Sequence, residues 1–227
     1  MDGPVLVVAA HPDDEVLGCG GTIAKLVDDG VAVHVAFLAD GVYSRDGVSI
    51  EISGQLDARR TAATKACSVL GVKSVWFGEF PDNRMDTIAL LDIAQTVERL
   101  VHQHKVATVF THHAGDVNID HRRTLDAVVI ACRPQPGQTV RTILSFEVPS
   151  STEWQLPGNA PAFVPNWFVD ISTTLDRKLA ALDAYAIELR NWPHPRSRRG
   201  VEYLARWRGA TTGSDAVEAF VLGRHLA

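Results

Sequence analysis

The 227-residue sequence contains few cysteines and no long apolar run. Its three cysteines, Cys19, Cys67 and Cys132, are far apart and form no CxxC pair, which argues against a disulfide framework and favours a reducing compartment. No stretch approaches the ~20 apolar residues that span a bilayer. The opening residues, MDGPVLVVAA, lack the basic and long apolar regions of a signal peptide. We therefore expect a cytoplasmic protein without membrane insertion.

An excess of positive charge is also missing. The formal net charge is −5, which argues against a nucleic-acid binder or an acidic-membrane binder. Hydrophobic residues make up 46% and charged residues 22%, as in soluble globular proteins. Because no repeat or convincing linker divides the chain, we expect a single domain over residues 1–227. Its oligomeric state stays open, a homo-oligomer included.

Apolar runs alternate with amphipathic stretches along the first two thirds of the chain. The continuous run at residues 5–10 (VLVVAA) indicates a strand buried on both faces, because both alternating faces are apolar. Further strands are expected at residues 31–38, 74–77, 107–113 and 142–148, and helices at residues 17–29, 54–70, 87–104 and 120–132. Asp86 is expected to cap the third of these helices. This alternation predicts an α/β fold with a mainly parallel sheet.

The pattern changes after Val148. Residues 149–165 contain four prolines and are expected to form a long loop that could cover a site. A strand at 166–172, a helix at 173–190 and a basic turn, WPHPRSRRG, follow. A further helix and a last apolar segment, AVEAFVLG, close the chain.

The stretch AHPDDE places one histidine and three acids directly after the first strand. In an open parallel sheet, ligands bind beyond the carboxyl ends of the strands, so these charges can line a cleft. His and carboxylate ligands suit a zinc-type ion. His11 and Asp14 are three residues apart across Pro12, so a turn can aim both at one point while Asp13 stays free.

A second polar segment, THHAGDVNIDHRRT, follows the strand at 107–113. It could supply the third protein ligand that a tetrahedral zinc with an open position needs. Its candidates are His112, His113, Asp116, Asp120 and His121. Zinc lowers the pKa of its bound water toward ~7, and a nearby free carboxylate can then act as general base. Together the two segments outline a metal-assisted hydrolase.

The motif AHPDDE, followed by GCGGT and later by NIDH, resembles the PIG-L/LmbE-like family of zinc-dependent N-deacetylases. Further matching segments are R…LGV at 60–72, FPDNR at 80–84, FEVPSSTEW at 146–154 and the closing EAF. The resemblance covers most of the chain. It implies a Rossmann-like three-layer sandwich that removes an acetyl group from an amino sugar, leaving a free amine and acetate.

The resemblance also implies residue roles. His11, Asp14 and His121 would be the metal ligands, and Asp13 the general base. Asn118 stands where relatives have a histidine that stabilises the oxyanion. An amide can still donate a hydrogen bond there, but it cannot act as a cationic acid. Three alternatives therefore remain: Asn118 acts in a weaker form, His112 or His113 takes the role, or zinc carries most of the charge. Asp13, once protonated, is the first candidate for protonating the leaving amine.

Several other residues have two readings. Asp120 either caps the helix that follows it or orients a ligand histidine, and Glu15 is either a partner of the helix dipole or part of the site. The resemblance aligns Arg60, with Arg59 as its rival, with a substrate-binding arginine. The predicted substrate contacts are Arg60, Asp82, Asn83, Arg84, His112, His113 and Glu147. The basic group His194, Arg196, Arg198 and Arg199 either binds a phosphate or is a solvated turn. Trp154, Trp167 and Trp192 either stack on a sugar or pack in the core.

We therefore predict a hydrolase that deacetylates a small-molecule N-acetylated sugar, free, glycosidic or nucleotide-linked, with Zn²⁺ as cofactor. Iron(II) or cobalt fits the same ligands. The alternatives are a zinc amidase acting on another acylated small molecule and a non-catalytic carbohydrate- or metal-binding module. A dinucleotide-binding protein is disfavoured, because GCGG does not form the GxGxxG fingerprint.

Overall fold

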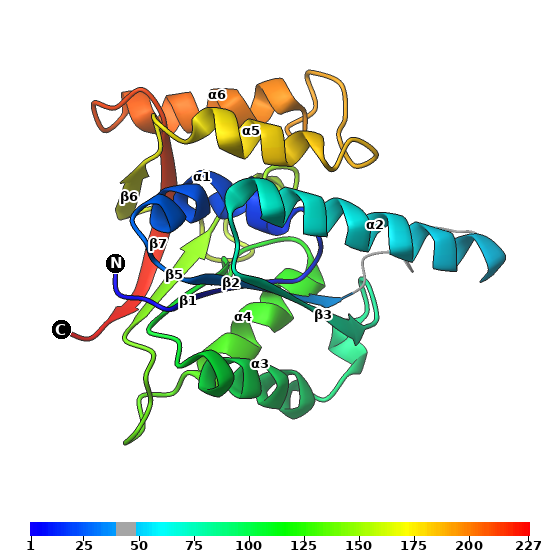
Figure 1. Ribbon diagram of the computed structural model, residues 1–227, viewed down its shortest axis with the longest axis vertical. Coiled ribbons are helices and arrows are strands. Elements are labelled where there is room, and N and C mark those ends of the chain that lie inside the picture. The colour runs from blue at the N-terminus through cyan, green and yellow to red at the C-terminus, as the bar shows by residue number, and fades with distance from the viewer. Residues whose placement is uncertain (40–48) are drawn as a thin grey trace.

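The computed structural model describes residues 1–39 and 49–227, whose strands form one seven-stranded sheet (Figure 1). The strand order is β3-β2-β1-β4-β5-β7-β6. The first five positions are held by β3 (Ser74–Phe80), β2 (Val33–Ala39), β1 (Val5–Ala9), β4 (Thr108–His112) and β5 (Thr142–Phe146). These five pair in parallel, whereas β7 (Val217–His225) runs antiparallel to both β5 and β6 (Trp167–Asp170). The predicted mainly parallel sheet is confirmed.

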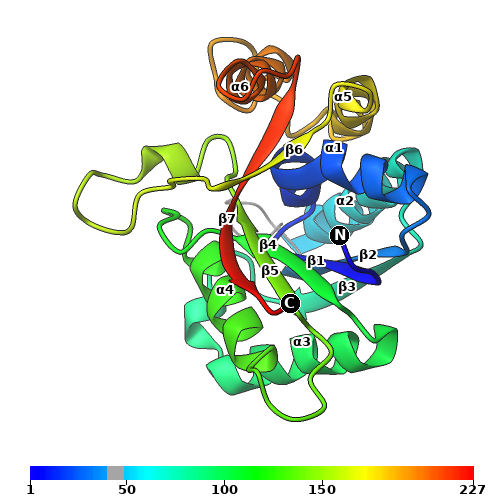
Figure 2. The ribbon, with the colours of Figure 1, turned by 90° about the vertical axis from the view of Figure 1, so that its left-hand side faces the viewer.

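Helices cover both faces of the sheet and make three layers, as Figures 1 and 2 show. One face carries α1 (Asp14–Asp28), α2 (Ser49–Leu70), α5 (Leu175–Asp183) and α6 (Arg198–Ala210). The other carries α3 (Leu90–His104) and α4 (Ile119–Ala131). Alternate residues of β1 enter the two cores: Val5 and Val7 face α1, and Leu6 and Val8 face α3. The continuous apolar run is thus the consequence of burial on both faces.

The glycines of GCGG let α1 pack closely on its neighbours. A Cβ atom on Gly18 would lie 2.3 Å from the ring of Phe146, and one on Gly21 would lie 2.6 Å from Ile171. The helix bends at Cys19, where φ is −147°. The backbone N–H groups of Gly21 and Thr22, just past the bend, donate to the carboxylate of Glu218 on β7. Close packing, rather than dinucleotide binding, accounts for these glycines.

Two predicted helices are shorter in the structure. The helix predicted at 87–104 begins at Leu90, after a 3₁₀ turn η1 (Met85–Thr87), and Asp86 does not cap it. A distant carboxylate explains the turn, because Asp120 accepts a hydrogen bond from the backbone N–H of Met85 at 2.9 Å. The helix predicted at 173–190 is reduced to α5, and the chain continues in turns to α6.

The predicted loop at 149–165 is confirmed and contains one 3₁₀ turn, η2 (Thr152–Trp154). It projects from the sheet between β5 and β6 (Figure 2). Among the residues that the structure describes, no helix combines the length and the apolar character that crossing a bilayer requires.

Candidate metal centre and active site

A cavity of about 380 Å³ opens at the carboxyl ends of the parallel strands. Loops after β1, β3, β4 and β5 supply most of its wall, and α2 and the segment between α5 and α6 complete it. This is the edge at which an open α/β sheet binds ligands. The lining residues are His11, Asp13, Asp14, Arg59, Asp82, Asn83, Val117, Asn118, His121, Ser150, Ser151, Trp154, Glu188 and Arg196.

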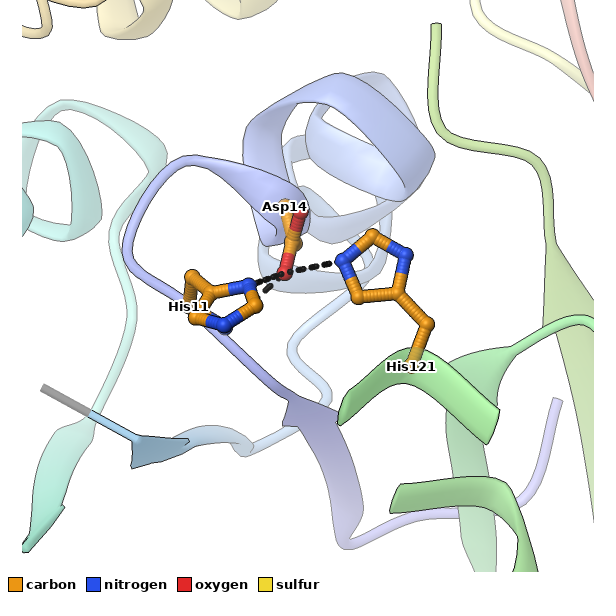
Figure 3. Close-up of side chains that lie close together, drawn as sticks. All are labelled: His11, Asp14 and His121. Carbon is orange, nitrogen blue, oxygen red and sulfur yellow. Dashed lines mark hydrogen bonds and ion pairs between the residues drawn. The ribbon is translucent and has the colours of Figure 1, made fainter. Parts of the chain in front are cut away.

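His11, Asp14 and His121 converge at the bottom of this cavity (Figure 3). Asp14 Oδ2 lies 3.5 Å from His11 Nδ1 and 3.4 Å from His121 Nε2. His11 belongs to the loop after β1, Asp14 starts α1, and His121 comes from the first turn of α4. All three side chains are buried. Their donor atoms lie within 4.8 Å of one another, so one ion can contact all three.

The electrostatics of this trio favour a bound cation. Burial alone lowers the pKa of His121, but the carboxylates of Asp14 and Asp116 outweigh it and raise the pKa to about 9. Burial raises the pKa of Asp14, but the imidazoles of His121 and His112 outweigh it and hold the pKa well below its usual value. Positive charge is thus attracted to the point between these groups. Two imidazoles and one carboxylate are also a donor set that zinc-type ions use, so the residues fit such an ion.

A second acidic pair contacts the other side of the His11 ring. His11 Nε2 lies 2.9 Å from Asp120 Oδ2 and 3.1 Å from Asp82 Oδ1. Asp120 also accepts hydrogen bonds from the backbone N–H groups of Asn83 and Met85. Both of its oxygens are therefore in use, which favours orientation of His11 over direct metal ligation. This cluster (His11, Asp82, Asp120) is the less suitable of the two candidate sets.

Asn118, and not Asp120, caps α4. The Asn118 side-chain oxygen accepts the backbone N–H of Asp120 at 2.8 Å. Its amide nitrogen donates to Asn83 Oδ1 at 3.1 Å, along the cavity wall. Of the two readings of Asp120, contact with a ligand histidine is the one the structure shows.

Asp116 has a role that the sequence did not assign. Its Oδ2 atom lies 3.1 Å from His121 Nδ1, on the side of the ring away from Asp14. Asp116 also accepts hydrogen bonds from the hydroxyls of Ser151 and Thr152 and from the backbone N–H of Asn118. A carboxylate behind a ligand histidine fixes the orientation of the ring. The position of Asp116 in the polar segment after β4 was the only signal in the sequence.

Asp13 is not among the three residues whose donor atoms cluster as a candidate metal site. Its backbone is left-handed, with φ at 111°, which is unusual for a residue other than glycine and is often found at functional sites. The Asp13 N–H donates to Glu15 Oε2, and Tyr185 O–H donates to Glu15 Oε1 at 2.7 Å. Glu15 is fully buried and holds the backbone of Asp13 through this hydrogen bond, although it does not itself line the cavity.

The carboxylate of Asp13 faces Arg196, whose Nη1 atom lies 3.3 Å from its Oδ2. Burial raises the pKa of Asp13 to about 6, against the lowering effect of Arg196. A carboxylate with such a pKa is ionised at neutral pH and still basic enough to accept a proton.

Five of the seven predicted substrate contacts lie outside the cavity lining, and three of them, His112, His113 and Glu147, have partners elsewhere. His112 is fully buried, and its Nε2 atom accepts the backbone N–H of Ala10 at 2.8 Å. Burial lowers the pKa of His112 to about 3, and its ring stacks on His121 at 3.9 Å. His113 contacts the carbonyl of Pro161 and the ring of Phe163, so it anchors the 149–165 loop. Both oxygens of Glu147 are bound by Arg208. These contacts give no support to the substrate role predicted for each of them, which stays a prediction.

The side chains of Arg59 and Arg60 point in different directions from α2. Adjacent helical residues point about 100° apart, so only one of them can face the cavity. Arg59 lines it, 3.7 Å from Glu188, whereas the Arg60 guanidinium lies over the ring of Phe77. Of the two candidates, Arg59 is the one that lines the cavity, and a substrate-binding role for either stays a prediction. In the FPDNR turn, Asp82 and Asn83 line the cavity, and Arg84 is exposed outside it.

The basic group between α5 and α6 does not form one cluster. Arg196 reaches the cavity, where it contacts Asp13 and Ser150. Arg198 pairs with Asp183, and the Arg199 guanidinium lies over the rings of Trp192 and Tyr203. Sequence analysis missed the contact between Arg196 and Asp13, because 183 residues separate the partners.

Comparisons with known proteins find a matching family and similar folds. The sequence model of the PIG-L family, described as GlcNAc-PI de-N-acetylase, matches residues 6–132. The diacetylchitobiose deacetylase of Thermococcus kodakarensis is 28% identical, covering 78% of this chain and 67% of its own. The 4-oxalmesaconate hydratase of Pseudomonas putida is 30% identical, covering 83% and 75%. A solved N,N'-diacetylchitobiose deacetylase from Pyrococcus horikoshii has the same fold, with a TM-score of 0.79 and 21% identity over 97% of this chain and 83% of its own.

Proposed function

The chain belongs to the PIG-L family of de-N-acetylases, and from that premise we propose that it removes an acetyl group from an N-acetylated sugar derivative with the help of zinc. His11, Asp14 and His121 would hold the ion. The observation that carries the proposal is Asp13, a buried carboxylate that stands beside this trio without belonging to it and opens on the same cavity.

A bound zinc ion supplies a Lewis acid and lowers the pKa of water. The residues of the chain do the rest. Asp13 takes a proton from water as general base, and Arg196 and the N–H contact to Glu15 hold it in place. The protonated Asp13 then returns that proton to the leaving amine, so one group serves both steps.

Asn118 is the side-chain donor best placed for the acetyl oxygen. Its amide nitrogen lies on the cavity wall and in this structure donates to Asn83. A small rotation of the Asn83 side chain would release this donor for substrate. His112 and His113 are unsuited to that role, because neither lines the cavity.

The charges of the cavity favour an uncharged sugar over an anionic substrate. Among the residues that the structure describes, the two arginines of the cavity lining both face acids, Arg196 facing Asp13 and Arg59 facing Glu188. A phosphate or polycarboxylate ligand requires cations that are not already paired. This argues against a nucleotide-linked sugar. It also argues against the kind of anionic acid named for the hydratase relative, although that enzyme shares the family.

The test is the release of acetate and amine from a panel of N-acetylated sugars, neutral glycosides and UDP-linked sugars included, with zinc-loaded and chelator-treated protein. We expect metal-dependent release from a neutral glycoside. Protein with one zinc per chain that hydrolyses no member of the panel would contradict the proposal. Activity toward an unsaturated tricarboxylic acid of the kind named for the hydratase relatives would instead assign a hydratase, and activity toward another acyl amide would assign an amidase.

A further inference from the structure

Trp154 is a large apolar side chain in a cavity whose lining is mostly polar. It lies in η2, lines the cavity and is 53% exposed. Val117, also in the lining, is 39% exposed. By contrast, His11, Asp14 and His121 are buried. The apolar residues therefore stand at the rim of the cavity, and the candidate chemistry lies at its bottom.

The segment that carries Trp154 is held from several sides. The hydroxyls of Ser151 and Thr152 both donate to Asp116, the carboxylate behind His121. The carboxylate of Glu153 accepts the backbone N–H groups of Ser150 and Ser151. These bonds connect the wall that carries Trp154 directly to the metal-ligating region. An exposed side chain on so constrained a backbone loses little conformational freedom when a ligand binds.

Within the described parts of the chain, one aromatic ring contacts the indole. The ring of His194 meets it edge-on, with centroids 5.8 Å apart and planes at 82°. An edge-on contact restrains the orientation of the indole without stacking on it. A half-exposed tryptophan face at the mouth of a binding cavity is suited to stacking against a flat or C–H-rich ring of a ligand.

We propose that Trp154 is a specificity-determining residue of this chain: its exposed indole is a stacking platform for a ring attached to the N-acetylated sugar and sets which glycosides bind tightly. This inference rests on the proposed deacetylation. With the acetamide at the bottom of the cavity, the substituent of the sugar extends toward the rim. The ring could be a second pyranose, which offers its C–H face, or an aromatic aglycone.

The experiment measures affinity without turnover. Zinc-loaded protein is titrated calorimetrically with three amines of the product type, which a deacetylase cannot hydrolyse further: methyl glucosaminide, phenyl glucosaminide and the disaccharide of two β-1,4-linked glucosamines. We expect a ring-bearing amine to bind about tenfold more tightly than the methyl glycoside, as one stacking contact allows. Tighter binding of the phenyl glycoside would indicate an aromatic aglycone, and tighter binding of the disaccharide would indicate a second pyranose.

Three variants assign that gain to a residue. Trp154→Ala should abolish the preference for the ring-bearing amine, and Trp154→Phe should keep most of it. Trp207→Ala is the matched control, because Trp207 is 65% exposed on α6 and does not line the cavity. In turnover of the N-acetylated ring glycoside, Trp154→Ala should raise KM with little change in kcat, whereas a loosened metal site would lower kcat.

A ring preference that survives in Trp154→Ala would overturn the proposal, and so would the absence of any preference in the unmodified protein. Failure of the deacetylation proposal looks different. In that case acetate is not released from any N-acetylated sugar, but the ring-bearing amines still bind more tightly through Trp154.

Discussion

Two groups of buried charge contact α1, and they are neutralised in opposite ways. In the middle of the helix, the ammonium of Lys178 donates to Glu218, and the Glu218 carboxylate also accepts the N–H groups of Gly21 and Thr22. The ammonium donates further to the carbonyl of Leu17. Both side chains are 4% exposed, and each charge has its partner within the chain. This region is complete without a ligand.

The start of the same helix is built differently. Asp14 faces the rings of His11 and His121, and Asp82, Asp116 and Asp120 surround those rings. Burial lowers the pKa of both rings, but these carboxylates outweigh it and raise the pKa of His121 to about 9 and that of His11 well above its usual value. Even with both rings protonated, the four carboxylates carry more charge than the two imidazoles among the described residues, so a divalent ion fits this end of α1. Both groups are buried, so burial does not distinguish a structural ion pair from a candidate ligand site. The balance of charge does distinguish them.

The largest expected effect is on turnover. Asp13→Asn keeps the size of the side chain and removes its basicity, so kcat should fall by about 10²–10⁴-fold. Zinc content, measured by elemental analysis, should stay the same, because Asp13 is not among the clustered ligand atoms. Loss of zinc in this variant would move Asp13 into the ligand set.

Breaking the Lys178–Glu218 pair, which contacts the middle of α1, should lower the stability of the protein rather than its turnover. Lys178→Met leaves Glu218 buried without its counter-charge, which costs roughly 3–5 kcal/mol of the free energy of unfolding. Urea unfolding of the metal-free protein measures this loss. The double variant Lys178→Met/Glu218→Gln should recover a large part of it. Equal stabilities of the single and double variants would mean that the charge is not what matters there.

A milder change sharpens the comparison at the metal site. Asp116→Asn removes the charge behind His121 but keeps hydrogen-bonding atoms, and zinc affinity should fall by about 10–100-fold. Competition with a chromogenic chelator gives the Kd. Asp126→Asn is the matched control on α4, since the Asp126 carboxylate is half-exposed and pairs only with Arg123 among the contacts found for it. The same zinc Kd in both variants would show that Asp116 does not contribute to metal affinity.

The adjacent arginines of α2 provide a test of the cavity wall. Arg59→Ala should lower kcat/KM by about 10–100-fold if the guanidinium binds substrate, because a hydrogen bond to a charged group is worth roughly 1.5–3 kcal/mol. Arg60→Ala should change kcat/KM little, since Arg60 lies over Phe77. The opposite ranking would restore the alignment that the sequence favoured.

The smallest expected effect concerns a buried histidine far from the site. Burial, and then the charges of His104 and Lys73, lower the pKa of His34 to about 4. The unfolded chain, with a histidine pKa near ~6.5, therefore binds the proton more tightly. His34 should reduce stability as the pH falls from ~6.5 toward 4 and have no such effect above that range. Urea unfolding should show a shallower loss in His34→Gln than in the unmodified protein; parallel curves would contradict this origin.

Much of the candidate site could be predicted because its signals are local. His11, Asp13 and Asp14 lie within four residues at the end of one apolar run, and the segment after β4 brings His121 to the same edge of the sheet. The parts that could not be predicted depend on partners distant in sequence. Arg196 reaches Asp13 across 183 residues, and Tyr185 reaches Glu15 across 170. No periodicity or spacing signals such contacts.

The sequence by itself determined the alternation of strands and helices, the parallel sheet and the edge where polar residues gather, because these follow from the period of the apolar residues and the direction of the strands. The tertiary structure alone decided which neighbour of a pair faces the cavity. Arg59 lines the cavity and Arg60 does not, and Asn118 is the N-cap of α4. His112 and His113 lie outside the cavity lining, whereas Trp154 lines the cavity and is exposed. The physical reason is that side-chain direction and ion pairing depend on packing against elements far along the chain.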